Sequence, residues 1–497
     1  MKFLSKSLNI LVERYLPSAY LFALILTIVA VVMGMTLGGA SLPEIAEMWY
    51  GGFWNFLEFG MQMVIVLVTG YALAQAPLAK RLLTKFAEVP KTQFAALTVV
   101  MVVSAGLGII SWGLGFVAGT IVSIEVARRT QTADFRLLVA SSYSAVIATQ
   151  PMSFALTAPL LVNTPEHPLE DKIGLIPVTQ TIFSPTMLTI SILGFIGVYI
   201  AFALMAPRAE EVVPFKGRPA DVTEQSKPDT AAEKIDNSII INAAVVILGI
   251  TAIALYFIAN GFNLELNIMN FIFLIAGICL HGSPAKYAKC ITDGIPAASG
   301  IVLQFPFYAG IIGIMAGSGL IVLIGQWFAS ISTDSTFPLL AYVSAMIVNI
   351  FVPSAGGQWQ VQGPVMIEAV QNMNISPATV VNAVSVGDMT TNLLQPFFVL
   401  PTLGLSKLGL KDIWGYCMTA MLVLMLISGT IFLLVPVLGG VTTAEEFNLP
   451  SALNHLRYAR LPFQNVDWGS EARTFPPVPA DTARKEPRGT CRAHRPR

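Results

Sequence analysis

Hydrophobic residues in this chain form long uninterrupted stretches rather than short alternating patterns. Residues 17–37, 238–259 and 413–438 are typical examples. Each is long enough to cross a bilayer, because about 20 mostly apolar residues span the hydrocarbon core. Such stretches recur from one end of the chain to about residue 438, so a single signal peptide cannot account for them. The pattern therefore predicts an all-α polytopic membrane protein.

Four polar or glycine-rich segments interrupt this apolar pattern. They are SWGLG (111–115), ATQPMS (148–153), PSAGGQW (353–359) and GDMTTNLLQP (387–396). Proline removes a backbone donor and clashes with the preceding turn, so the helices predicted over 135–160 and 377–403 are expected to kink or unwind. Irregular backbone at membrane depth is tolerated only where protein or a water-filled cavity covers it. The interruptions therefore indicate functional positions.

Composition agrees with a membrane protein and excludes several other classes. Of the 497 residues, 55% are hydrophobic and only 12% are charged, against about 25% charged in an ordinary soluble domain. The net charge of zero gives no indication of a nucleic-acid partner. The four cysteines and four histidines form no metal site, disulfide framework or nucleophile constellation, and no Walker A motif is present. We therefore expect neither an enzyme nor a bound cofactor.

The distribution of basic residues predicts the orientation. If the N-terminus is cytoplasmic, nineteen Lys and Arg residues fall in cytoplasmic segments. The opposite loops, at about 39–52, 161–180, 260–267 and 318–336, hold only Lys172. Basic residues in short loops are retained on the cytoplasmic side, so this bias favours a cytoplasmic N-terminus in the bacterial inner membrane.

Two apolar segments cannot cross the membrane in this topology. Residues 92–127 lie between Lys91 and Arg128, which are both cytoplasmic, so the segment enters and leaves by the same face. Residues 337–371 must likewise enter and leave by the outer face. We therefore predict two opposed re-entrant hairpins, broken at SWGLG and PSAGGQW, and about nine full spans.

Similar landmarks occur twice in the chain. Gly52 recurs as Gly294 at an offset of 242, and the Gln-Pro pair at 150–151 recurs at 395–396 at an offset of 245. Five crossings separate the two units, so their orientations are opposite. Inverted repeats with interrupted helices are typical of secondary transporters, whose sites lie near the bilayer midplane. Coincidence is the alternative, because Gly, Pro and Gln are common in membrane helices.

These patterns divide the chain into six segments. They are an N-terminal span (1–38), a first repeat (39–206) with hairpin 92–127, a cytoplasmic linker (207–237), two connecting spans (238–290), a second inverted repeat (291–438) with hairpin 337–371, and a polar tail (439–497). The tail is expected to be disordered.

The interruptions supply candidate substrate ligands. A helix N-terminus aimed at the midplane carries partial positive charge and free donors, which suit a carboxylate. Glycine allows close backbone approach, and serine and glutamine supply neutral hydrogen bonds. Close helix packing is the alternative role of the glycines. The substrate-binding candidates are Ser111, Trp112, Gly113, Gly115, Gln150, Ser153, Ser354, Gly356, Gly357, Gln358, Trp359 and Gln395.

Asp388 is the acidic residue near the centre of a predicted full span. An ionisable group at that depth is expensive and is a functional hypothesis by default. We expect it to couple transport to Na⁺ or H⁺, together with Thr390, Thr391 and Asn392. A structural Asp, hydrogen-bonded to a neighbouring helix, is the alternative.

Four stretches resemble the bacterial short-chain fatty acid transporters, the acetoacetate and butyrate carriers. The stretches are GGFWNFLEFGMQMVIVLVTGYALA (51–74), LQFPFYAGI (303–311), FVPSAGGQWQVQGP (351–364) and GYCMTA (415–420). The resemblance implies a secondary carrier of the ion-transporter superfamily, with substrate contacts at PSAGGQW and SWGLG. Gln358 stands where the family often has His, and the first broken span is less Gly-rich than is usual in the family.

Two other functions remain open on the sequence alone. One is a carrier of C4-dicarboxylates or other organic anions. The other is a cation/proton antiporter, which usually has more than one buried carboxylate. In each case the expected partners are the lipid bilayer, a small solute and, in many such carriers, a second copy of the chain as a homodimer.

Overall fold

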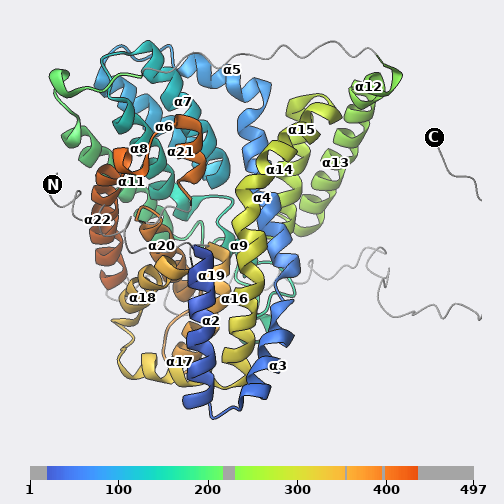
Figure 1. The fold of residues 1–497 in the computed structure, drawn as a ribbon, viewed down its shortest axis with the longest axis vertical. Coiled ribbons are helices and arrows are strands. Elements are labelled where there is room, and N and C mark those ends of the chain that lie inside the picture. The colour runs from blue at the N-terminus through green and yellow to red at the C-terminus, as the bar shows by residue number, and fades with distance from the viewer. Residues whose placement is uncertain (1–18, 216–229, 353–354, 395–397, 435–497) are drawn as a thin grey trace, which may run out of the picture. The chain divides into compact units, whose positions relative to one another are not determined.

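The computed structural model describes residues 19–215, 230–352, 355–394 and 398–434, and all regular structure in these ranges is helical (Figure 1). The chain divides into two units, Met1–Ala444 and Glu445–Arg497. Every described residue belongs to the first unit. Two candidate site residues, Ser354 and Gln395, and the predicted tail lie outside the described residues.

Long apolar helices make up most of the first unit. Seven helical stretches are long and apolar enough to cross a membrane by length and composition. The prediction of an all-helical protein with several apolar spans is therefore confirmed, and the count of nine spans stays a prediction. The long helices are α2 (Ala19–Thr36), α4 (Leu57–Gln75), α6 (Gln93–Ile110), α7 (Trp112–Arg129), α8 (Phe135–Thr149), α11 (Pro185–Met205), α13 (Ile239–Asn260), α14 (Leu266–His281), α16 (Ser299–Gly317), α18 (Phe337–Phe351), α19 (Ala355–Val370), α20 (Pro377–Thr391) and α22 (Leu410–Leu434).

Shorter helices lie where the sequence analysis expected loops. The segments predicted as outer loops at 39–52 and 318–336 contain α3 (Leu42–Phe53) and α17 (Leu320–Ser330), and their place outside the membrane stays a prediction. Ser41 and Glu44 form a capping box at the start of α3. The side chain of Ile45, in the first turn of this helix, is buried. The other short elements are α5 (Pro77–Phe86), η1 (Gln150–Met152), α9 (Thr157–Leu161), α10 (Glu170–Ile173), η2 (Ala209–Glu211), α12 (Ala231–Asp236), α15 (Pro284–Gly294), η3 (Ile295–Ala298) and α21 (Leu400–Ser406).

Helices α3 and α16 pack closely because glycines line their contact. A methyl group on Gly52 would come within 2.7 Å of the Ala309 carbonyl oxygen and 2.8 Å of the Gly313 Cα. Further along, the rings of Phe59 on α4 and Phe305 on α16 stack, with centroids 5.6 Å apart. Small residues at helix crossings allow this backbone approach in membrane proteins.

Two helical hairpins approach each other from opposite ends. Figure 1 shows α6 and α7 beside α5 towards one end, and α18 and α19 on the side of α17 towards the other. The first hairpin breaks only at Ser111, whose backbone is extended. Gly113 and Gly115 already lie in the first turn of α7, so this break is narrower than the predicted SWGLG. In the second hairpin, α18 ends at Phe351, Val352 is not helical, and α19 begins at Ala355.

Two further helices are interrupted as the prolines predicted. The helix α8 ends at Thr149, and the chain continues through η1 and an irregular stretch to α9. The helix α20 ends at Thr391, and the next helix after it is α21; Pro396 between them lies outside the described residues. Gln150, Pro151 and Ser153 in the first stretch, and Asn392 and Leu393 in the second, are buried.

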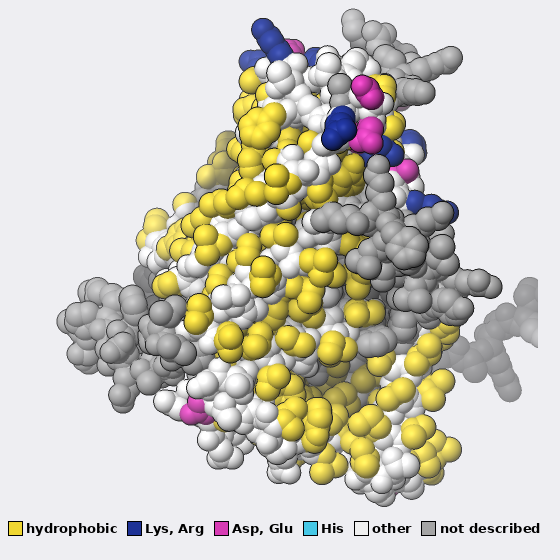
Figure 2. Space-filling view, turned by 90° about the vertical axis from the view of Figure 1, so that its left-hand side faces the viewer, with side chains coloured by type: hydrophobic (Ala, Val, Ile, Leu, Met, Phe, Trp, Pro, Cys, Tyr) yellow, Lys and Arg dark blue, Asp and Glu magenta, His cyan; other side chains and the backbone are white. Residues whose placement is uncertain are grey.

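The surface has the distribution expected of a bilayer-embedded protein. On the face drawn in Figure 2, hydrophobic side chains cover the middle, and Lys and Arg gather at the upper end. On α13, Ile240 and Ile258 are 82% and 79% exposed. So continuous an apolar surface is unfavourable in water but favourable in the hydrocarbon core of a bilayer.

Candidate functional site

The tip of the first hairpin is fixed to the first interrupted helix. The indole Nε1 of Trp112 donates to the Ala155 carbonyl at 3.0 Å. From the same interrupted stretch, the Ser153 hydroxyl donates to the Gly108 carbonyl at 2.7 Å. The Phe154 N–H donates to the Ile109 carbonyl, also at 2.7 Å. Trp112 and Ser153, both predicted from the sequence, therefore lie at one site.

Two polar atoms at this tip are buried without a hydrogen-bond partner among the described residues. They are the hydroxyl of Ser111 and the side-chain carbonyl Oε1 of Gln150. A buried polar group left unsatisfied costs about 1–3 kcal/mol. Beside Ser111, the first N–H groups of α7 have no partner within their own helix. The tip therefore has both donors and acceptors that no described side chain or backbone group uses.

The tip of the second hairpin is tied together by a glutamine ladder. Gln358 Nε2 donates to the Ala345 carbonyl and to Gln362 Oε1, both at 2.9 Å. Gln362 Nε2 then donates to the Ser344 hydroxyl at 3.1 Å. These bonds join α18 to α19, so the Gln358 amide nitrogen is used inside the hairpin. Its Oε1 has no partner among the described residues.

The neighbouring predicted residues occupy the first turn of α19. Gly356, Gly357 and Trp359 are buried, and the Trp359 indole packs against Gly363 one turn further on. The N-terminus of this helix therefore faces protein rather than lipid. Gly356 lies against the ring of Phe59, where a methyl group would overlap with the ring, so only glycine fits this position.

Asn349 connects the second hairpin to the second interrupted helix. Its fully buried Nδ2 lies 2.6 Å from the Asp388 carbonyl, 3.0 Å from the Thr391 hydroxyl and 2.9 Å from Asn392 Oδ1. Thr391 in turn donates to the Met346 carbonyl at 3.1 Å. One amide thus holds the part of the chain predicted to bind the cation. The sequence analysis missed Asn349, although a lone amide in the apolar run AYVSAMIVNIF was a signal for it.

The Asp388 carboxyl group is buried, with 1% of the residue exposed. The Asn392 side-chain amide is the neighbouring polar group that interacts with this carboxyl, but neither carboxyl oxygen has a partner in good hydrogen-bond geometry in the described part of the chain. Thr390 points elsewhere: its hydroxyl donates to the Val386 carbonyl and accepts from Tyr342. An ionised carboxylate in such surroundings requires a counter-cation or a proton.

Aromatic residues join the first tip to the second interrupted helix. The Tyr143 hydroxyl on α8 donates to the Asn392 carbonyl at 2.7 Å. The rings of Trp112 and Phe398 meet edge to face, with centroids 5.6 Å apart. Phe116 lies between them and Tyr143. The two halves of the chain therefore meet at one site, which draws on both interrupted helices and the first tip directly and on the second hairpin through Asn349.

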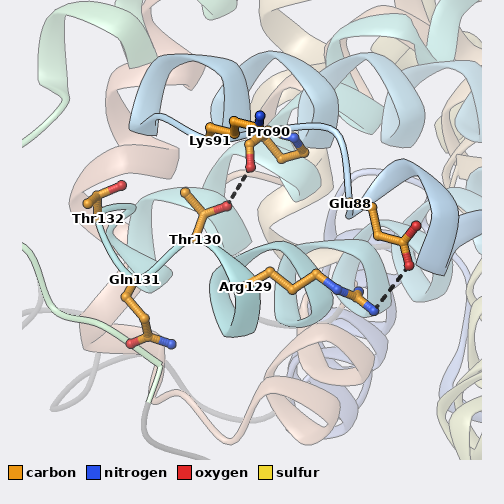
Figure 3. A pocket seen from close by; sticks show the side chains of 7 residues that line it. All are labelled: Glu88, Pro90, Lys91, Arg129, Thr130, Gln131 and Thr132. Atoms are coloured by element: carbon orange, nitrogen blue, oxygen red, sulfur yellow. Dashed lines mark hydrogen bonds and ion pairs between the residues drawn. The ribbon is translucent and has the colours of Figure 1, made fainter.

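A shallow surface pocket of about 360 Å³ lies elsewhere, where the two ends of the first hairpin meet (Figure 3). The close-up shows Arg129 directed towards Glu88, at 3.6 Å, and the Thr130 hydroxyl donating to the Pro90 carbonyl at 2.9 Å. Because α6 and α7 each rise about 1.5 Å per residue, this pocket is about 25 Å from Ser111. It is separate from the candidate site.

Comparisons with known proteins identify the family of this chain. A family described as short chain fatty acid transporter matches residues 1–435. A putative short-chain fatty acid transporter of Escherichia coli strain K12 is 36% identical over 436 residues, which cover 87% of this chain and 98% of that protein. One from Haemophilus influenzae is 37% identical over 430 residues, covering 84% and 96% respectively.

A solved structure supports the fold. The crystal structure of the Alcanivorax borkumensis YdaH transporter, described as having an unusual topology, aligns with a TM-score of 0.59 over 85% of this chain and 99% of that one. Its sequence is only 17% identical, so the likeness concerns the fold alone. The family match and the two curated relatives carry the assignment: this chain belongs to the short-chain fatty acid transporter family.

Proposed function

We propose that this protein is a secondary active transporter that moves short-chain fatty acids or related small carboxylates, such as butyrate and acetoacetate, across the bacterial inner membrane. A cation gradient, of Na⁺ or H⁺, drives the uptake. The observation that carries the proposal is the meeting of the first hairpin tip and two interrupted helices beside Asp388, whose carboxyl oxygens have no partner in good hydrogen-bond geometry among the described residues.

The first tip suits a carboxylate substrate. Helix α7 directs its N-terminal N–H groups into the buried region beside the orphan Ser111 hydroxyl. Donors and partial positive charge at a helix N-terminus bind anions. A monocarboxylate needs one such donor cluster and an apolar surface for its alkyl chain. The aromatic group of Trp112, Phe116 and Phe398 lies beside this tip.

Asp388 suits a coupling cation. Its carboxyl oxygens, the Thr391 hydroxyl and the carbonyls released at the end of α20 are hard oxygen donors of the kind that Na⁺ accepts, and the carboxyl group also accepts a proton. Binding the cation would neutralise a charge that is otherwise expensive in the interior. The substrate anion and the cation together would carry less net charge across the membrane than either alone.

The proposal includes two inverted repeats, which the hydrogen bonds support. Thr149 donates from the first interrupted helix to the Ala105 carbonyl of the first hairpin, at 3.5 Å. Thr391 donates from the second interrupted helix to the Met346 carbonyl of the second hairpin, at 3.1 Å. The threonines are 242 residues apart and the carbonyls 241. Equivalent side chains thus connect equivalent elements in each half.

Uptake into proteoliposomes tests the proposal. The purified chain is reconstituted, and accumulation of labelled butyrate, acetoacetate or succinate is measured with an imposed Na⁺ gradient, an imposed proton gradient, or neither. We expect accumulation of a monocarboxylate above its equilibrium level with one of the two gradients, and none in protein-free liposomes. Failure of every carboxylate to accumulate with either gradient would exclude the proposed function.

The antiporter alternative receives no comparable support. It calls for a second acidic residue next to Asp388, and the only other fully buried acidic side chain in the described ranges is Asp134. Asp134 caps α8 through the Leu137 N–H, and it also binds the Val213 N–H and Arg136. The length of α8, about 22 Å, separates it from the interrupted stretch.

A further inference from the structure

One face of helix α4 passes both hairpin tips. At one point of this face, a methyl group on Gly70 would come within 3.0 Å of the Leu114 nitrogen and 3.2 Å of the Ser111 hydroxyl, both at the first tip. At another point, the ring of Phe59 is in contact with Gly356 in the first turn of α19. The same helix therefore contacts both re-entrant hairpins.

Two apolar side chains lie on that face between the two contacts. Met63 and Val66 follow Phe59 by four and seven residues and precede Gly70 by seven and four, a spacing that places all four positions in one row along the helix. Eleven residues separate Phe59 from Gly70, which corresponds to about 16 Å of helix. Figure 1 shows α4 running continuously from α3 to α5, so nothing interrupts this row.

Burial confirms that the row faces protein. Met63 is 4% exposed and Val66 is 1% exposed, whereas Met61, on the opposite side of the same helix, is 60% exposed. Gly113 reinforces the contact, because a methyl group placed on it would lie 3.7 Å from the Leu67 carbonyl oxygen. The side chains of this row carry no hydrogen-bonding group, and the polar side chains of the same stretch, Gln62 and Thr69, lie outside the row.

We propose that Met63 and Val66 form the surface against which the alkyl chain of the substrate lies, and that their size sets the chain length the transporter accepts. This inference rests on the proposed function, in which the carboxylate binds at a hairpin tip. A carboxylate held by donors at a tip leaves its alkyl chain to cover the nearest apolar surface. At the first tip the aromatic group of Trp112, Phe116 and Phe398 forms one side of that surface, and the row on α4, which meets the same tip at Gly70, forms the other.

The expected effect follows from the size of the side chains. An apolar pocket discriminates one methylene by about 10- to 200-fold. Met63→Ala removes several heavy atoms from this surface. The affinity for hexanoate relative to butyrate should therefore rise by about tenfold. Val66→Leu adds a methylene to this surface, so the affinity for butyrate relative to propionate should fall. Met63→Leu conserves volume and should retain the parental preference.

The experiment measures inhibition of labelled butyrate uptake by unlabelled acids of two to eight carbons, in proteoliposomes. Met61→Ala on the exposed side of α4 is the matched control for Met63→Ala, and the half-buried Val64→Leu is the control for Val66→Leu. We expect the chain-length optimum to shift only in the Met63→Ala and Val66→Leu proteins. Comparing ratios of inhibition constants removes differences in the amount of folded protein.

The outcomes separate the two proposals. Active transport with the same chain-length profile in all variants would overturn the role of α4 and leave the proposed function intact. A parental protein that accumulates no carboxylate would overturn both. If Met63→Ala does not reconstitute, the Val66→Leu profile decides the matter, because an unchanged optimum in that protein contradicts the inference.

Discussion

At the scale of single residues, the site depends on a few buried polar groups that lack ordinary partners. The Asp388 carboxyl oxygens, the Ser111 hydroxyl and Gln150 Oε1 have no hydrogen-bond partner among the described residues. Buried polar groups are normally satisfied, and most exceptions have a specific explanation. The proposed function assigns a ligand and a cation to these three groups, which all lie at or near helix interruptions.

The role of Asp388 predicts a loss of coupling on its neutralisation. Asp388→Asn keeps the shape of the side chain but cannot carry the charge that attracts a cation. We expect gradient-driven accumulation to fall by at least about 100-fold, as is usual when a charged group essential to binding is removed. Uptake into proteoliposomes with and without the gradient measures this. The exposed loop residue Asp334 provides the control Asp334→Asn, which should accumulate substrate normally; equal accumulation by both variants would remove Asp388 from the coupling site.

The contacts of Asn349 predict that its substitution lowers the stability of the folded protein without removing a charge. Its amide nitrogen has close polar neighbours on three residues of the second interrupted helix. Asn349→Ala leaves a buried carbonyl and a hydroxyl without their donor, at a cost of about 2 kcal/mol. The apparent melting temperature of the detergent-solubilised protein should fall by a few degrees. Asn260→Ala, at the exposed end of α13, should leave it unchanged, and an equal fall in both variants would contradict this role.

At the scale of elements, the sequence anticipated the helix interruptions better than the short helices. Pro151 has a direct consequence for the backbone, so the break after Thr149 was predictable from local chemistry, whereas the glycines of PSAGGQW lie inside α19. Helices α3, α5, α15 and α17 were missed because they are too short to register as spans, and α5 and α15 also mix polar and apolar residues. Their stability comes from tertiary packing, which no local pattern expresses.

The contacts between distant residues of the site could not be predicted from the sequence, for a related reason. Tyr143 and Asn392 are 249 positions apart, and Trp112 meets Phe398 across a similar interval. Sequence reasoning identified Trp112 and Asn392 separately, from the interruptions in which they lie. It had no means of pairing them, because the pairing depends on how two hairpins pack between two halves of the chain.

The close glycine contact between α3 and α16 predicts that a larger side chain at this crossing destabilises the protein. A methyl group on Gly313 would already meet the Met48 carbonyl and the Gly52 Cα. Gly313→Leu should separate the two helices and lower the melting temperature and the folded yield, since overpacking costs about 1–3 kcal/mol or more. Size-exclusion chromatography and thermal unfolding measure both. Gly106→Leu on α6, where nothing lies within 4 Å of an added methyl group, should behave like the parent; comparable damage from the two substitutions would contradict this explanation.

At the scale of the whole molecule, the proposed transport cycle assigns one gate to each hairpin. The first hairpin ends in the ion pairs of Glu125 with Arg128 and Arg129, and the second ends at the hydrogen bond from Gln371 to Glu368. Lys172 forms an ion pair with Glu368 at 3.0 Å, so the one basic residue of the predicted outer loops contacts the base of the second hairpin. Opposite gates around one site are what alternating access requires.

The charge distribution predicts which gate faces the cytoplasm. Thr132 lies in the exposed turn at the base of the first hairpin, and Ser335 lies in the exposed turn before the second. The excess of basic residues near the first hairpin places Thr132 inside and Ser335 outside. In a background without cysteine, a membrane-impermeant thiol reagent should label Ser335→Cys in intact cells and Thr132→Cys only after permeabilisation. Labelling of Thr132→Cys in intact cells would reverse the orientation, and substrate would then enter from outside through the first hairpin rather than the second. The proposed sites for the carboxylate, the cation and the alkyl chain would stay the same, because Trp112, Asp388 and the row on α4 are assigned independently of which hairpin faces the cytoplasm.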